Sequence, residues 1–183
     1  EVVAGRGDDT LIGGRGYDEI RGGEGEDLIF NSESGRVFGG DGDDVLIGVG
    51  PGQLLAAIED DFEDDFIDIQ GPPDQQGEAG MLLDGGSGTN HYFASSAGNT
   101  TILGGDDFDR IYIAGGSGNF VDAGTGSDND DDIADFGEST ILSGGGLDYY
   151  SLSADETNQI STLPDIDIVE DALVILLDQA ELD

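Results

Sequence analysis

Aspartate recurs at a fixed place in four nine-residue segments near the start of the chain. The segments are AGRGDDTLI (residues 4–12), GGRGYDEIR (13–21), GGEGEDLIF (22–30) and GGDGDDVLI (39–47). Their sixth residues are Asp9, Asp18, Asp27 and Asp44. A hard cation such as Ca²⁺ prefers oxygen ligands from carboxylates and backbone carbonyls. The regular spacing of these carboxylates therefore predicts a series of Ca²⁺ sites.

The residues around each aspartate predict the elements that position it. Glycine at the first, second and fourth places permits a positive φ and close packing in a turn, so that carbonyl groups can point inward. The last three residues of each segment form a short strand, with Leu11, Ile20, Ile29 or Leu46 in the core. One segment cannot bury that side chain alone, so the segments must stack. The fixed period predicts an all-β protein, a right-handed parallel β-roll or solenoid.

The four segments share the pattern G-G-x-G-x-D-x-U-x, in which U is a large apolar residue. In this pattern the chain resembles the RTX, or repeats-in-toxin, family of secreted calcium-binding proteins. The resemblance implies that two segments make one coil, so that turns alternate between two sides and ions lie between same-side neighbours. It also implies type I secretion, for which the export signal lies at the extreme C-terminus of the protein.

The spacing assigns the early turns to these two sides. Asp9, Asp27 and Asp44 are 18 and 17 residues apart and define the first side. Asp18 belongs to the second side, where the next repeat, residues 31–38, has no aspartate. We therefore expect calcium along the first side and little calcium on the second side after Asp18.

The same asymmetry returns after residue 84. The first-side turns are GGSGTN (85–90), GGDDFD (104–109), AGTGSD (123–128) and SGGGLD (143–148), and the second-side turns between them have no sixth-place aspartate. We expect Thr100, Asn119 and Ser139 to hold the second-side turns by local hydrogen bonds. Asn90 replaces a carboxylate and Asp107 replaces a glycine, which predicts weaker sites. The complete set of predicted metal ligands is Asp9, Asp18, Asp27, Asp44, Asn90, Asp107, Asp109, Asp128 and Asp148.

Two segments interrupt or end the roll, giving divisions at 1–48, 49–80, 81–151 and 152–183. The step from Asp44 to Asn90 exceeds one coil of about 18 residues by about 28, which predicts a second-side insertion at 49–80. Apolar residues at steps of three and four predict an amphipathic acidic helix within it, which either covers the second side or binds a partner. The helix residues are Leu55, Ile58, Phe62, Phe66 and Ile69. The apolar segment 152–183 is predicted to cap the roll or to join it to another domain.

Composition limits the possible functions. The formal net charge of -37 must be compensated by cations before the turns can stack, so we expect folding to depend on metal. Five Lys and Arg residues argue against nucleic acid or an anionic membrane as partner. Cysteine is absent, and no apolar stretch reaches the length of a membrane span. The first residues, Glu1 to Val3, resemble a strand of a preceding coil, which predicts a fragment of a longer protein.

Several short sequence motifs suggest other functions but have a simpler structural interpretation. Arg6-Gly7-Asp8 spells an integrin-binding tripeptide, but these residue types are also permitted at repeat positions three to five. His91 is the only histidine and is predicted to be a surface strand residue. The acidic run 128–132 lacks the glycine and glutamate of an EF-hand. Zinc-protease, G-x-S-x-G and P-loop motifs are absent, so we expect no catalysis by this segment.

The sequence thus predicts a non-catalytic, Ca²⁺-binding structural module of a larger bacterial protein, located outside the cell or at its surface. The full-length parent protein could still be an enzyme. The alternative is a recognition module, such as an adhesin, surface-layer or carbohydrate-binding segment. The partner would then be a cell surface, a glycan or another copy of the chain.

Overall fold

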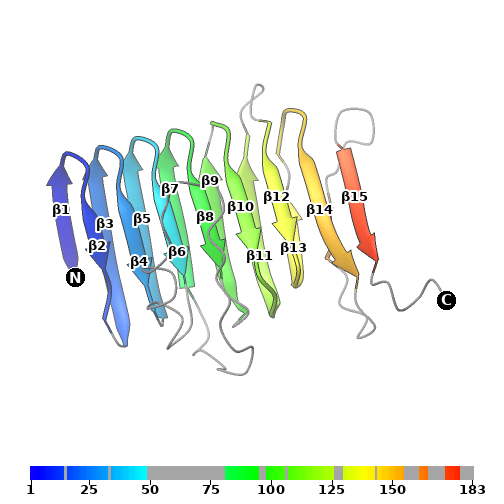
Figure 1. Ribbon diagram of the computed structural model, residues 1–183, viewed down its shortest axis with the longest axis horizontal. Helices are drawn as coiled ribbons and strands as arrows, with labels where there is room; N and C mark the ends of the chain where they lie inside the picture. Colours follow the sequence, from blue (N-terminus) through cyan, green and yellow to red (C-terminus); the bar gives the residue numbers. More distant parts are fainter. Residues whose placement is uncertain are drawn as a thin grey trace.

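The computed structural model describes residues 1–14, 16–32, 34–48, 81–94, 98–105, 107–125, 130–142, 144–154, 161–164 and 172–177. These residues form two sheets that face each other along the length of the molecule (Figure 1). The seven-stranded sheet A contains β1 (Val2–Arg6), β3 (Tyr17–Glu24), β5 (Ser34–Asp41), β7 (Met81–Ser87), β9 (Thr100–Gly105), β11 (Ser117–Gly124) and β13 (Glu138–Leu142). The eight-stranded sheet B contains β2 (Thr10–Ile12), β4 (Leu28–Asn31), β6 (Val45–Gly48), β8 (His91–Ala94), β10 (Arg110–Ile113), β12 (Asp132–Asp135), β14 (Tyr149–Ala154) and β15 (Ala172–Leu177).

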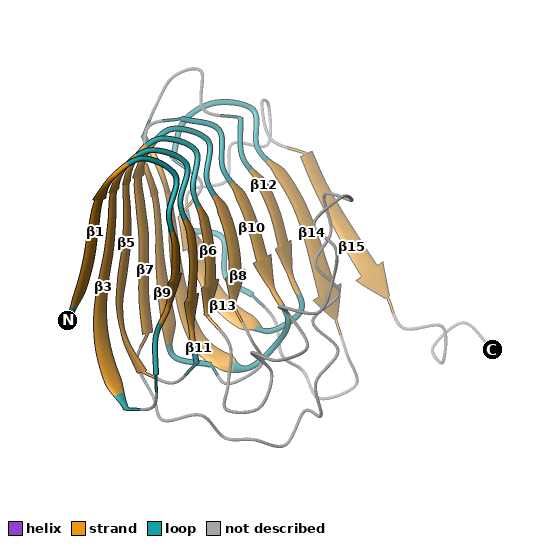
Figure 2. Cartoon of the chain, turned by 60° about the vertical axis from the view of Figure 1, so that its left-hand side comes forward, coloured by secondary structure: helices purple, strands orange, loops and turns teal. Residues whose placement is uncertain are grey.

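Successive strands alternate between the two sheets, and every strand pairing is parallel. One coil therefore contains one strand of each sheet, and the coils stack side by side (Figure 2). This arrangement confirms the predicted parallel β-solenoid. The described part of the chain contains no helix, and thus no helix able to cross a membrane.

The core is built from two ladders of apolar side chains that point between the sheets. Sheet A contributes Ile20, Val37, Leu83, Ile102, Val121 and Ile141, all fully buried. Sheet B contributes Ile29, Leu46, Tyr92, Ile111, Ile133 and Tyr150, each at most 2% exposed. Most of these residues are β-branched or aromatic, which favours strands. The predicted core positions of Ile20, Ile29 and Leu46 are confirmed, and Leu11 packs partly buried at the first coil.

The first-side turns require glycine because adjacent coils approach closely there. Gly23 and Gly40 have φ values of +132° and +128°, which side chains with a Cβ rarely adopt. A Cβ on Gly40 would also overlap the carbonyl oxygen of Gly23 in the preceding coil. Glycine therefore sets both the turn conformation and the distance between coils.

The predicted interruption falls between β6 of sheet B and β7 of sheet A. Around it the roll is continuous, because β5 pairs with β7 and β6 pairs with β8. The described strands on either side, β6 and β7, meet at the second side of the roll. The predicted helix itself, within residues 49–80, lies outside the described residues.

The roll continues past Ser151. β15 pairs with β14 and extends sheet B by one strand, while Thr162 bridges to Thr140 beside sheet A. Leu163 packs against the apolar core. The C-terminal residues thus add backbone pairs to both sheets, and their action as a cap stays a prediction.

Candidate metal centre

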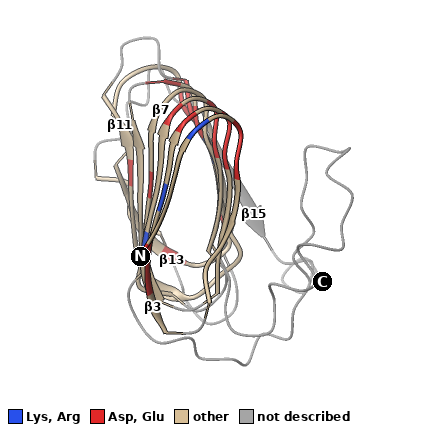
Figure 3. Ribbon diagram, turned by 90° about the vertical axis from the view of Figure 1, so that its left-hand side faces the viewer, with Lys and Arg blue, Asp and Glu red and all other residues tan. Residues whose placement is uncertain are grey.

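Seven residues at the first-side turns form a continuous ladder, which we call the acidic ladder. Its members are Asp9, Asp27, Asp44, Asn90, Asp109, Asp131 and Asp148. The backbone N–H of each of the first six donates to the Oδ1 atom of the next member, at 2.8 to 3.0 Å. The side chain of every member after Asp9 therefore has one oxygen fixed by the preceding coil. Acidic residues gather along this row of turns in the view down the roll (Figure 3).

The second oxygen of four ladder carboxylates is buried without a hydrogen-bond partner. These atoms are Oδ2 of Asp27, Asp44, Asp109 and Asp131, and the four residues are at most 2% exposed. A buried carboxylate oxygen without a partner is costly, because it has lost its hydration without compensation. A cation beside each oxygen would remove that cost.

At the Asp27 and Asp44 rungs, the first glycine of the turn leaves room for such a cation, whereas Ala123 stands at the equivalent place of the Asp131 rung. A Cβ on Gly39 would overlap Oδ2 of Asp44 and lie 2.7 Å from the carbonyl oxygen of Gly85. A Cβ on Gly22 would likewise overlap Oδ2 of Asp27 and lie 2.7 Å from the carbonyl oxygen of Gly39. A carboxylate oxygen and a carbonyl oxygen from the next coil therefore border the same small space.

The donor set suits calcium better than a transition metal. Among the described residues, no three His, Cys, Asp or Glu side chains converge on one point. Each site would therefore combine one or two carboxylates with several backbone carbonyls. Ca²⁺ accepts such all-oxygen sets with flexible geometry, whereas Mg²⁺ requires a smaller and nearly octahedral site.

Burial changes the acidity of these carboxylates. It raises the pKa of Asp44 and Asp109 to about 7 and the pKa of Asp131 to about 8, and it also raises the pKa of Asp27. At Asp44 the backbone N–H of Asp27 partly offsets burial, while the negative charge of Asp27 adds to it. The ion-free roll therefore holds protons on groups that a divalent cation would keep ionised.

A second set of aspartates also links adjacent first-side turns. Here the carboxylate lies in the earlier coil and the backbone N–H donor lies in the later coil. Asp8, Asp43 and Asp130 accept hydrogen bonds from backbone N–H groups of the following coil, at 3.0, 2.8 and 2.7 Å. This role was not predicted, although the pairs Asp8-Asp9, Asp43-Asp44 and Asp130-Asp131 indicate it. Asp8 of the Arg6-Gly7-Asp8 tripeptide thus has a structural role.

The predicted register was wrong at one turn. The structure places Asp131 in the acidic ladder between Asp109 and Asp148, whereas the sequence analysis assigned that place to Asp128. Asp128 lies outside the described residues. The missed signal is that every ladder residue precedes an inward-facing strand residue by two positions, as Asp131 precedes Ile133.

The remaining predicted ligands differ in their surroundings. Asp9 forms the half-buried first rung of the ladder, and Asp148 forms its buried last rung. Tyr150 donates from its hydroxyl to Oδ2 of Asp148 at 3.4 Å. Asp107 is exposed and accepts from the backbone N–H of Gly88 at 3.0 Å, so it lies beside the ladder rather than in it. Asn90 is a ladder member whose surroundings are described below.

The second side begins with acceptors that have no partner and continues with hydrogen bonds, which include those accepted by the buried carboxylate of Asp135. Oδ2 of Asp18 and Oδ1 of Asn31 are both buried without a partner. Asn119 accepts from the backbone N–H of Thr100 at 3.1 Å and donates to the carbonyl of Gly115 at 3.3 Å. The backbone N–H of Ser139 donates to the Ser161 hydroxyl at 3.4 Å. Of the predicted local bonds, the one from Asn119 to Gly115 is confirmed. Thr100 and Ser139 instead bond across coils through their backbone N–H groups, and the buried hydroxyl of Ser139 has no partner.

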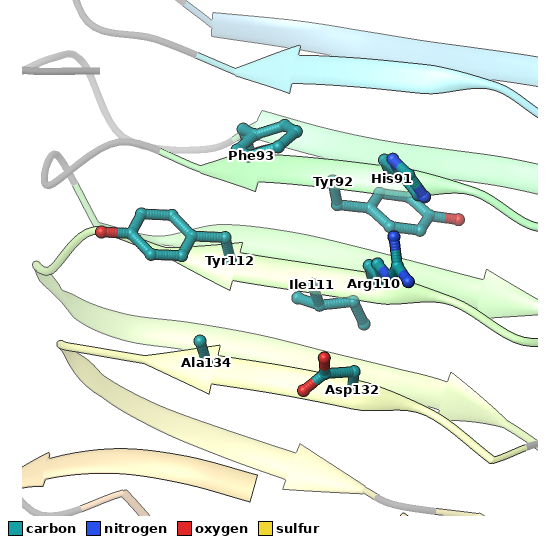
Figure 4. Close-up of a pocket in the computed structure, with 8 residues that line it drawn as sticks. All are labelled: His91, Tyr92, Phe93, Arg110, Ile111, Tyr112, Asp132 and Ala134. Atoms are coloured by element: carbon teal, nitrogen blue, oxygen red, sulfur yellow. The ribbon is translucent and has the colours of Figure 1, made fainter. Parts of the chain in front are cut away.

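The outer face of sheet B carries a shallow pocket outside the metal ladder (Figure 4). His91, Arg110 and Asp132 pair in register across β8, β10 and β12. Phe93 and Tyr112 form the next row, with their ring centroids 6.2 Å apart, and the Tyr112 ring lies 5.4 Å from that of Phe136. His91 is half-buried in this strand face, which agrees with its prediction as a surface strand residue.

Comparison with known families identifies the N-terminal coils. The model of the RTX calcium-binding nonapeptide repeat matches residues 3–33 and 34–49, in four copies. No curated protein and no solved structure gives a significant match. The matched residues include Asp9, Asp18, Asp27 and Asp44, so the ladder from Asn90 onward is assigned by its geometry.

Proposed function

This chain belongs to the RTX calcium-binding nonapeptide-repeat family, and on that premise we propose that it is a calcium-dependent structural module of a larger bacterial protein that folds outside the cell. The observation that carries the proposal is the row of buried, partnerless Oδ2 atoms on Asp27, Asp44, Asp109 and Asp131. These oxygens lie along one row of first-side turns, in four of the stacked coils, as a structural ion column requires. The module stacks coils and has no catalytic role of its own.

Calcium would control folding by charge compensation. The net charge of -37 opposes a compact roll through self-repulsion, and the ladder carboxylates come closer together when the coils stack. Ions that bind only the folded state stabilise it by mass action. Low intracellular Ca²⁺ would leave the chain unfolded for export, and the higher external concentration would fold it.

Calcium titration of two neighbouring variants tests the proposal. Asp27→Asn removes a ladder carboxylate, whereas Glu26→Gln removes an equal charge from an exposed side chain one residue away. We expect Asp27→Asn to require several-fold more Ca²⁺ for half-maximal β signal in circular dichroism, and Glu26→Gln to match the unaltered chain. A fully folded chain in EDTA at neutral pH and low salt would contradict the proposal.

A second candidate function is glycan recognition on the outer face of sheet B. The observation that favours it is the row of Phe93, Tyr112 and Phe136 beside Arg110. Aromatic faces pack against the C–H faces of sugars while their rims remain polar, and the net charge of -37 opposes an anionic ligand, so a neutral glycan is the favoured ligand. Tyr112→Ala should abolish binding to a neutral polysaccharide, whereas Tyr17→Ala, on exposed sheet A surface, should not. Equal binding by both variants would reject this candidate.

A further inference from the structure

Tyr92 occupies an unusual position in the core. It is fully buried and lies two residues after Asn90, where the other described coils except the last place an aliphatic residue on this side of the roll. Its hydroxyl accepts a hydrogen bond from the backbone N–H of Gly85 at 3.0 Å. The same hydroxyl lies 2.7 Å from the carbonyl oxygen of Leu103 and 3.1 Å from that of Gly104. The Tyr92 hydroxyl therefore bridges two successive first-side turns.

This position corresponds to that of the candidate ion at neighbouring rungs. A Cβ on Gly39 would meet Oδ2 of Asp44 and the carbonyl oxygen of the next turn. A Cβ on the equivalent Gly85 would instead overlap the Tyr92 hydroxyl and lie 2.6 Å from Nδ2 of Asn90. The carbonyl oxygen of Gly104, which the hydroxyl contacts, is the counterpart of the Gly85 carbonyl at the Asp44 rung. The hydroxyl and amide thus fill the space that carboxylate and carbonyl oxygens border elsewhere.

The side chain of Asn90 also differs from the aspartate side chains at the neighbouring rungs. Its Oδ1 accepts from the backbone N–H of Asp44 at 3.0 Å, and its Nδ2 donates to the carbonyl of Gly88 at 3.1 Å. The side chain is neutral and presents an N–H donor where Asp27, Asp44 and Asp109 present a partnerless oxygen. Calcium needs negatively charged or carbonyl oxygens, so the residues at this rung do not fit an ion.

From this contrast we infer that Asn90 and Tyr92 together replace the calcium ion at one rung with a fixed hydrogen-bond network. The inference rests on the proposed calcium function of the other rungs. Burial, followed by the nearby charge of Asp109, raises the pKa of the Tyr92 hydroxyl, so the group remains a donor at physiological pH. The rung on the C-terminal side of the long excursion is therefore closed without metal, and it divides the ion column into two groups.

The location gives this replacement a physical rationale. Asp44 and Asn90 are 46 residues apart, whereas other neighbours in the ladder are separated by 17 to 22 residues. Closing the longer loop costs additional chain entropy. A network of internal hydrogen bonds keeps this junction formed when an ion dissociates, because it does not depend on the calcium concentration.

Anomalous scattering from crystals of the unaltered chain grown with Ca²⁺ tests the inference directly. We expect density beside Asp27, Asp44, Asp109 and Asp131 and none between Asn90 and Gly104. An ion bound to Asn90 would overturn the inference and leave the proposed function intact. Absence of ions at every rung would contradict the proposed function, and the replacement inference with it.

Calcium stoichiometry of designed variants gives an independent test in solution. Asn90→Asp combined with Tyr92→Leu recreates the sequence pattern of the Asp44 rung, and we expect this double variant to bind one additional Ca²⁺. Tyr92→Phe is the control; it removes the bridging hydroxyl without supplying a carboxylate, so stoichiometry should stay constant while the melting temperature in saturating Ca²⁺ falls. An unchanged count in the folded double variant, or loss of an ion in Tyr92→Phe, would refute the replacement.

Discussion

Asp44 and Asn90 are joined by a 3.0 Å hydrogen bond although 46 residues separate them along the chain. The bond has the same donor and acceptor atoms as those between adjacent coils elsewhere in the acidic ladder. The ladder therefore passes the excursion without a change of register. Ladder geometry is set by the coils themselves, and the length of the connecting chain does not alter it.

This continuity predicts the effect of removing the excursion. Replacing residues 53–78 with a short Gly-Ser turn should leave the calcium stoichiometry unchanged, because both partners of the Asp44–Asn90 bond are retained. Equilibrium dialysis measures the stoichiometry, and loss of an ion would contradict the prediction. The melting temperature separates the two roles of the segment: it falls if the segment covers the roll and stays constant if the segment binds a partner.

Substitution of Gly39 tests the space proposed for the ion. In Gly39→Ala the new methyl group would overlap Oδ2 of Asp44 and crowd the Gly85 carbonyl. We expect overpacking to destabilise the roll by about 1–3 kcal/mol and to remove one bound ion. Gly14→Ala is a matched control, because its Cβ would have no heavy atom closer than 4.0 Å beyond its chain neighbours. Calorimetric titration with Ca²⁺ should distinguish the two, and equal losses would reject the assignment.

The assignment of Asp131 to the ladder can be tested against that of Asp128. Asp131→Asn should remove one ion and raise the Ca²⁺ midpoint of folding, because Asp131 supplies a buried oxygen without another partner. Asp128→Asn makes the same change in charge three residues earlier and should leave the ion count unaltered. Atomic emission measures the number of calcium ions bound by each variant. Loss of an ion in Asp128→Asn alone would contradict the assignment of Asp131 to the ladder.

The pKa shifts predict opposite pH dependences with and without calcium. The raised pKa values of Asp44, Asp109 and Asp131, at about 7 to 8, mean that the ion-free roll binds more protons than the unfolded chain. Its stability is thus greatest below the unfolded pKa near 3.8 and is lost as pH rises through about 7 to 8. In EDTA, β signal should increase as the pH is lowered from 8 to 5.

With calcium present, protons and the ion compete for the same oxygens. The apparent Ca²⁺ affinity should therefore fall as the pH is lowered over the same range. Asp109→Asn removes one titrating ladder group and should make both dependences shallower. A Ca²⁺ affinity independent of pH between 5 and 8 would show that these carboxylates do not hold the ion.

The repeat pattern was sufficient to predict the fold class and the early ladder residues, and its resemblance to RTX repeats predicted the two-sided arrangement. Spacings of 18 and 17 residues leave one way to align Asp9, Asp27 and Asp44, because glycine fixes the turn and the apolar residue fixes the strand face. The insertion at 49–80 stays a prediction, made because the strands on both sides retain their patterns. The same local rules predicted the hydrogen bond by which Asn119 holds a second-side turn.

Tertiary structure decided what local spacing leaves open. Five aspartates or asparagines lie within residues 128–132, and only pairing of Ile133 with Ile111 selects Asp131 for the ladder. The role of Tyr92 was likewise hidden, because a tyrosine at a core position satisfies the apolar pattern of the repeat. Its hydroxyl can bridge two turns only because stacking of the coils places Gly85 and Gly104 beside it. A repeat period in the sequence does not specify such a contact between a side chain and the backbone of another coil.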